Sequence, residues 1–147
     1  MKGVLRQVAA RRTVTAGITV ALVAAGMAGT AVAADASSAV NRAAVVVVVR
    51  THRPFGKILY NTRIHALYYL PSGSCTGSCL SIWPPLLMPR GKTIPKGTSC
   101  LRTVAFRHRR QVTYNHHRLY TFVSDGRGTV TGNNVAGFKV AKVVRCH

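Results

Sequence analysis

Acidic side chains are almost absent from this sequence. Its 147 residues include 21 lysines and arginines but only two carboxylates, Asp35 and Asp125, which gives a formal net charge of +19. General acid–base catalysis by paired carboxylates is therefore excluded, because Asp125 is the only acid outside the N-terminal region. A chain of this charge is attracted to polyanions. We therefore expect a protein that is not an enzyme and needs no cofactor.

Long apolar runs are confined to the N-terminus. Residues 1–12 carry four basic residues and no acid, residues 13–30 are small and aliphatic, and Ala31-Val32-Ala33 has the pattern that signal peptidase cleaves. The alternative is a membrane anchor, but three glycines dilute the apolar run. We predict a signal peptide over residues 1–33, whose removal leaves a mature chain of net charge +15. Residues 34–42 are predicted to form a flexible leader at the start of that mature chain.

The position of the cysteines also bears on where the protein is found. No cysteine follows the apolar run, so a lipid anchor is not expected, and the mature chain is predicted to be secreted and not membrane-spanning. Cys75, Cys79, Cys100 and Cys146 indicate two disulfides in an oxidising compartment. We favour pairing Cys75 with Cys79 and Cys100 with Cys146, although a crossed pairing such as Cys79 with Cys100 stays open.

Helical periodicity is nearly missing from residues 43–147. Short β-branched and aromatic segments alternate there with turn residues, which predicts a small all-β domain of antiparallel strands. Expected strands are residues 43–51 (buried), 57–60, 66–70, 101–106, 110–114, 119–123 and 138–144. A short helical turn is expected around Cys75 to Trp83, and residues 86–100 are expected to form a long connection.

Two stretches of the domain are similar to each other. Residues 56–73 and residues 111–125 both contain Tyr-Asn followed by Leu-Tyr, so that Tyr60-Asn61 matches Tyr114-Asn115 and Leu67-Tyr68 matches Leu119-Tyr120. The sequence therefore predicts two related hairpins.

Several blocks resemble a secreted repeat family of unknown function, often found as bacterial lipoproteins and described by a Tyr-x-aromatic-x-x-Asp motif. The similar blocks are VRTHRPFGKIL (49–59), Leu67-Tyr68, CTGSC (75–79), WPPL (83–86), QVTYN (111–115), Leu119 to Phe122 with Asp125, and residues 132–138. The resemblance spans residues 44–144 and implies a β fold and an exported protein. Gly73 and Leu70 depart from the motif in the first copy, and the second copy's turn lacks the family's Gly and Pro.

Asp125 is the candidate ligand-binding residue of the second copy, together with Tyr114, Asn115, Tyr120 and Phe122. The alternative is a structural role, in which Asp125 closes the turn at residues 126–128 or pairs with an arginine. The aromatic residues are expected mostly in the core.

Two further groups of side chains are candidates for binding. Arg107, Arg109, Arg110 and Arg118 surround a hairpin tip and are the expected contacts for a polyanion. His116 and His117 are weak candidates for a metal site, because no helical His-x-x-x-His pattern or supporting carboxylate is visible.

Three hypotheses follow. The first is a noncatalytic basic protein with a binding or structural role at the cell surface or cell wall, held by anionic envelope polymers. The second is an extracytoplasmic module linked to a metal or to redox chemistry through His116, His117 and Asp125. The third is a cationic protein that binds nucleic acid or anionic membranes. No specific protein partner is inferred.

Overall fold

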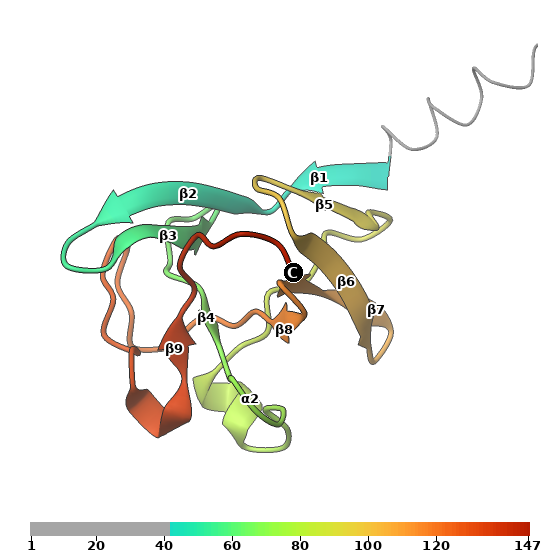
Figure 1. Ribbon diagram of the computed structural model, residues 1–147. Coiled ribbons are helices and arrows are strands. Elements are labelled where there is room, and N and C mark those ends of the chain that lie inside the picture. The colour runs from blue at the N-terminus through green and yellow to red at the C-terminus, as the bar shows by residue number, and fades with distance from the viewer. Residues whose placement is uncertain (1–41) are drawn as a thin grey trace, which may run out of the picture. The chain divides into compact units, whose positions relative to one another are not determined.

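The computed structural model describes residues 42–147 and confirms a small all-β domain (Figure 1). The predicted signal peptide and residues 34–41 of the leader lie outside this range. Its elements are β1 (Ala43–Val45), β2 (Val47–His52), β3 (Gly56–Asn61), β4 (Tyr68–Tyr69), α2 (Cys79–Ile82), β5 (Ile94–Lys96), β6 (Leu101–Phe106), β7 (Arg109–Tyr114), β8 (His117–Arg118), the 3-10 helix η1 (Val135–Gly137) and β9 (Lys139–Val140).

The valine-rich segment is divided into two strands. β1 pairs in parallel with β5, and β2 pairs antiparallel with β3, with Val49 opposite Leu59. The prediction that the whole of residues 43–51 is buried was wrong, since Val46 and Val47 are buried but Val45 is 58% exposed and Val49 is 37% exposed. The segment changes its pairing partner at Val46, and neither strand is buried along its whole length.

Gly97 allows the chain to pass directly over β2. Its φ is +134°, and a Cβ atom built on it would lie 1.7 Å from the carbonyl oxygen of Val47. The neighbouring Lys96 carbonyl accepts a hydrogen bond from the Val46 N–H (3.0 Å). Only glycine permits both this backbone conformation and this close approach.

The second hairpin matches its prediction in part. The expected strand over residues 119–123 is not formed, because the partner of β7 is β8, which lies within the expected loop, and Tyr120 makes only isolated bridges. β6 pairs antiparallel with β7 over their full length, and β7 pairs with the short strand β8. Asn115 and His116 form the turn between β7 and β8 with φ of +45° and +70°. Two left-handed residues in a two-residue loop match the right-handed twist of the flanking strands, so the turn keeps its geometry without glycine.

Three further expectations need correction. The expected strand over residues 66–70 is shortened to β4, which pairs with β9 and not with β3. Residues 86–100 contain the strand β5, which pairs with β1 and was not predicted. The expected strand over residues 138–144 is shortened to β9, which pairs with β4, while residue Lys142 makes one isolated bridge to Ile58. All three strands depend on partners far away in the sequence, which local periodicity does not reveal.

The first hairpin is closed by a triangle of backbone hydrogen bonds. The Leu67 N–H donates to the Leu59 carbonyl (2.9 Å), the Leu59 N–H donates to the Ala141 carbonyl (2.8 Å), and the Ala141 N–H donates to the Leu67 carbonyl (2.8 Å). Residue Ala141, which follows the second hairpin in sequence, therefore completes the first one.

The second hairpin has the same triangle. The Leu119 N–H donates to the Val112 carbonyl (3.0 Å), the Val112 N–H donates to the Leu86 carbonyl (2.8 Å), and the Leu86 N–H donates to the Leu119 carbonyl (2.9 Å). Leu86 follows the first hairpin in sequence, so the two hairpins exchange their closing segments.

The two hairpins meet at equivalent residues. The Tyr68 N–H donates to the Tyr120 carbonyl (2.9 Å), and the Tyr120 N–H donates to the Tyr68 carbonyl (2.9 Å). This reciprocal pair is what an approximate two-fold relation requires. Equivalent positions in the two triangles match Leu67-Tyr68 with Leu119-Tyr120, as predicted. They also match Leu59 with Val112, which displaces the predicted match of Tyr60 with Tyr114 by one residue.

The core has two sides because several segments are buried on both faces. Leu59 and Leu67 enter one cluster, which we call the aliphatic cluster, whereas their neighbours enter the other, the aromatic cluster. The aliphatic cluster contains Val46, Val47, Leu59, Leu67, Met88, Val112, Tyr114, Leu119 and Ala141. The aromatic cluster contains Ile58, Tyr60, Ala66, Tyr68, Cys75, Trp83, Tyr120, Phe138 and Val140. Tyr60 and Tyr114 thus lie in different clusters, which agrees with the displaced match.

Trp83 is the centre of the aromatic cluster. Its ring stacks on Phe138 (ring centroids 3.8 Å apart) and on Phe122 (4.5 Å), and it meets the Tyr68 ring edge to face. α2 ends at this residue, since the Trp83 N–H donates to the Cys79 carbonyl. The favoured disulfides, Cys75–Cys79 and Cys100–Cys146, are both present.

Candidate functional site

Asp125 is the centre of a buried hydrogen-bond cluster. It is 6% exposed, and its Oδ2 accepts a hydrogen bond from the Tyr68 hydroxyl (2.6 Å). Its Oδ1 accepts from the Thr131 N–H (2.8 Å) and from the Thr131 hydroxyl (2.7 Å). The Gly132 N–H in turn donates to the Tyr68 oxygen (3.2 Å). These bonds stabilise a buried carboxylate with neutral donors.

The contacts of Asp125 differ from the two structural contacts that the sequence suggested, a turn at residues 126–128 and an arginine. The carboxylate does not close the turn at residues 126–128, because it binds Thr131 instead, and its donors are neutral groups, not an arginine. It joins the loop after the second hairpin to Tyr68 of the first. The Gly128 N–H reinforces this contact by donating to the Ile64 carbonyl (2.8 Å). The acid that follows the second hairpin therefore fixes the tyrosine of the first.

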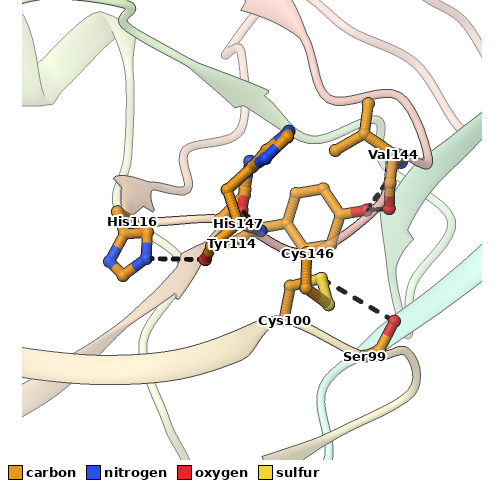
Figure 2. The surroundings of a disulfide bond; sticks show 8 residues. Ser99, Cys100, Tyr114, His116, Val144, Cys146 and His147 are labelled. Carbon is orange, nitrogen blue, oxygen red and sulfur yellow. Dashed lines mark hydrogen bonds between the residues drawn. A yellow bond between two sulfur atoms is a disulfide. The ribbon is translucent and has the colours of Figure 1, made fainter.

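The remaining residues of the motif do not converge on one ligand site. Tyr120 is buried in the aromatic cluster, and Phe122 covers Trp83. Tyr114 and Asn115 instead hold the C-terminal segment: the Val144 N–H donates to the Tyr114 hydroxyl oxygen (2.9 Å), and the His147 N–H donates to Asn115 Oδ1 (3.0 Å). Figure 2 shows Tyr114 and Val144 beside the Cys100–Cys146 disulfide.

Tyr68 gives the fold a predicted sensitivity to alkaline pH. Burial, and then the hydrogen bond to Asp125, raise the pKa of Tyr68 well above its ordinary value of 10.0. Its stabilising contribution is therefore complete below pH 10 and falls as pH rises further, because the unfolded chain then loses a proton that the folded chain retains. We expect the free energy of unfolding to decrease by up to about 1.4 kcal/mol per pH unit from this group.

Denaturant unfolding at a series of pH values, with tyrosinate absorbance as a second signal, measures this effect. Tyr68 should ionise only as the protein unfolds, and Tyr68→Phe should make the alkaline decline shallower. A folded protein whose five tyrosines all ionise together near their ordinary pKa, with no loss of stability, would contradict the prediction.

A strongly basic groove of about 610 Å³ lies between the β6–β7 hairpin and the segment before β5. We call it the basic groove. Its lining residues are Leu87, Met88, Pro89, Arg90, Gly91, Lys92, Thr93, Phe106, Arg107, His108, Arg109 and Arg110. Three of the four predicted polyanion contacts are among them. The lining contains five lysines and arginines and no acid.

The structure fixes the arginines of this groove by neutral contacts. Arg109 Nη2 donates to the Met88 carbonyl (2.5 Å), and Arg110 Nε donates to the Thr103 hydroxyl (2.7 Å). The Arg107 guanidinium lies over the Phe106 ring, 5.6 Å from its centroid. These contacts restrict the side chains without neutralising their charge, so less entropy is lost when an anion binds.

Arg118 does not belong to the groove. It lies half-buried in β8, and its Nη1 donates to Gln111 Oε1 (2.8 Å). Gln111 is fully buried and donates from Nε2 to the Leu119 carbonyl (3.0 Å). Arg118 therefore supplies a hydrogen bond to a buried polar side chain of the core. The sequence shows only that Arg118 is close to a hairpin tip, and this is equally true of a half-buried arginine and of an exposed one.

Arg90 and Lys92 are the groove residues that the sequence did not connect with the hairpin. They lie in the predicted long connection, which returns beside β7 because Leu87 bridges Gln111 and the Met88 N–H donates to the Arg110 carbonyl (2.9 Å). The basic character of this connection was the only sequence signal. Its contact with β7 depends on the exchange of closing segments.

The histidine candidates are separated by the fold. His117 packs against the Tyr69 ring (centroids 4.8 Å apart), and His116 Nε2 lies 3.2 Å from the His147 carbonyl oxygen. Within residues 42–147, no group of three His, Cys, Asp or Glu side chains is placed to hold a metal ion. Neither histidine is grouped with Asp125.

No protein family, curated protein or solved structure matches this chain. The resemblance to the secreted repeat family stays a prediction. In the part of the chain that the structure describes, no helix is both long and apolar enough to cross a membrane.

Proposed function

We propose that this is a secreted, noncatalytic basic protein that attaches to an anionic polymer of the cell surface or cell wall through the basic groove. The observation that carries the proposal is the groove itself, in which five lysines and arginines from two separate segments line one hollow. Asp125, the only acidic side chain of residues 42–147, is occupied by Tyr68 and Thr131. Asp125 therefore does not neutralise the positive charge of the groove.

The placement of the aromatic residues favours a polymer recognised by charge over a nucleic acid recognised by base stacking. Tyr60, Tyr68, Tyr114, Tyr120 and Trp83 are all buried. Phe106 is the one Phe, Tyr or Trp residue that lines the basic groove, and the Arg107 guanidinium lies over its ring. Non-specific binding of single strands depends on exposed rings as well as cations. Phosphate or carboxylate groups repeated along a polymer require only the cations.

Two features support secretion. The four cysteines form two disulfides, which persist in oxidising compartments. The N-terminal sequence has the charged, apolar and small-residue regions of a signal peptide. Attachment by charge would retain such a protein at the surface without a lipid or a membrane span.

The test is retention of the purified, oxidised protein on polyglycerol phosphate across a salt series. The variant Arg107→Asn with Arg110→Gln removes two groove charges, and asparagine tolerates the left-handed φ of Arg107 (+50°). A matched control, Arg63→Gln with Arg127→Gln, removes two exposed charges that do not line the groove. We expect the groove variant to reduce the slope of log affinity against log salt by about 2, and the control to leave it nearly unchanged.

Equal losses in the two double variants would show that net charge, and not the groove, determines binding. Loss of binding on addition of a chelator would favour a metal-dependent module instead. Tighter binding to single-stranded DNA than to polyglycerol phosphate at equal salt would favour the nucleic-acid alternative. Each of these three results would overturn the proposal.

A further inference from the structure

A second cleft, of about 590 Å³, has a different chemistry from the basic groove. We call it the amide cleft. Phe55, Tyr69 and His117 supply half-buried rings to its wall, and Asn133 and Asn134 supply amides. Its volume lies within the range of small-molecule sites, and its combination of apolar rings and a few polar groups is typical of them.

The rings of the amide cleft provide apolar surface. Tyr69 and His117 pack together with centroids 4.8 Å apart and planes inclined by 39°. On the other side, Lys142 Nζ lies 5.8 Å from the centroid of the Phe55 ring. Such half-exposed rings are suited to the C–H face of a sugar ring.

The polar groups of the amide cleft are mainly donors. Asn133 Oδ1 accepts from the Val140 N–H (3.0 Å), and Asn134 Oδ1 accepts from Lys139 Nζ (2.5 Å). These bonds orient both amides by their oxygens and leave their NH₂ groups as the hydrogen-bonding ends. Lys139 and Lys142 also line the cleft, and none of its lining side chains is acidic, so these groups suit a ligand that brings acceptors and a negative charge.

The C-terminal segment forms a further wall of the amide cleft. Val144 and His147 line it, and they are held by Tyr114, Asn115 and the Cys100–Cys146 disulfide (Figure 2). A cleft wall fixed by a covalent bond is pre-organised, which lowers the cost of ordering on binding.

From these features we propose that the amide cleft binds one sugar unit that carries a carboxylate. The carboxylate lies between Lys139 and Lys142, the sugar hydroxyls accept from the asparagine amides, and one face of the ring packs on Tyr69. The site is independent of the basic groove, and either proposal stands if the other fails.

The probe is methyl β-D-glucuronide, with methyl β-D-glucoside as the neutral sugar of the same shape. Amide shifts in proton–nitrogen NMR spectra of the oxidised protein measure the binding. We expect the glucuronide to shift residues around Asn133 and Lys139 with a Kd of about 1 mM, and the glucoside to bind at least about tenfold more weakly. Lys139→Gln with Lys142→Gln should weaken glucuronide binding about tenfold and leave the glucoside response unchanged. The groove variant Arg107→Asn with Arg110→Gln should bind as the unaltered protein does.

Three results would overturn the proposal. One is the absence of shifts at the amide cleft up to about 50 mM glucuronide. Another is an equal response to acetate at the same ionic strength, which would show that charge alone is recognised. The third is glucuronide binding that the groove variant abolishes and the lysine variant does not, which would place the sugar in the basic groove.

Discussion

Gly97→Ala is expected to destabilise the folded domain strongly. The new Cβ would lie 1.7 Å from the Val47 carbonyl oxygen and 2.6 Å from its carbon, and both contacts are to backbone. No side-chain rotation relieves a clash of this kind, so β2 must move away from the segment after β5. That movement breaks the Val46–Lys96 hydrogen bond at the edge of the aliphatic cluster. We expect a loss of at least about 4 kcal/mol in the free energy of unfolding.

Gly91→Ala is the matched control for Gly97→Ala. Gly91 also has a positive φ, +73°, but no atom lies within 4 Å of an added Cβ. The control therefore carries only the conformational cost, about 1 kcal/mol. Denaturant unfolding, followed by the fluorescence of Trp83, measures both variants. Equal stabilities of the two variants would show that the chain does not pass over Val47 as described.

Asp125→Asn is expected to cost about 3 kcal/mol. The carboxylate accepts three hydrogen bonds, two at Oδ1 from Thr131 and one at Oδ2 from the Tyr68 hydroxyl. The asparagine side chain has one oxygen where the carboxylate has two. Its NH₂ group must therefore face either Tyr68 or Thr131, both of which donate hydrogen bonds to Asp125. The variant also loses the charge that strengthens all three bonds, in a site where unsatisfied groups are costly.

The cycle formed by Asp125→Asn, Tyr68→Phe and the double variant separates the Tyr68 bond from the rest of the cluster. A favourable coupling between the two sites is expected, because they share one short hydrogen bond. Asp35→Asn changes the net charge by the same amount and is the control for charge alone. If Asp125→Asn were as stable as the unaltered protein but lost polyanion binding, Asp125 would be a ligand-binding residue and not a structural one.

The elements that the sequence predicted well are those whose partner is adjacent in the chain. β6 was predicted with its bounds, and β7 to within one residue, because a polar turn separates two segments rich in β-branched residues. The pairing of Leu67-Tyr68 with Leu119-Tyr120 was also found, since it depends on side-chain identity. The favoured disulfides were correct because the most local pair leaves only one partner for the other two cysteines.

The candidate site was harder to predict because its parts meet only through the fold. Arg107, Arg109 and Arg110 were recognised as exposed, whereas Arg118 was not separated from them, because a half-buried arginine bound to Gln111 has the same sequence signature. The cations that complete the groove come from the segment that carries Leu86. Likewise, Tyr68, the partner of Asp125, lies in the first hairpin, where no spacing rule points to it.

The exchanged closing segments have a consequence for how the chain folds during synthesis. The first hairpin is completed by Ala141, which is synthesised after the whole of the second hairpin. A nascent chain that ends before β9 therefore lacks the hydrogen bonds that Ala141 makes with Leu59 and Leu67. Neither half is a unit that can fold separately and then dock. Folding must wait until the ribosome has released nearly the entire domain, and contacts this distant in sequence make it slow. The chain therefore stays unfolded until nearly all of it has been made, and an unfolded polypeptide is the form that can be threaded through a narrow membrane channel.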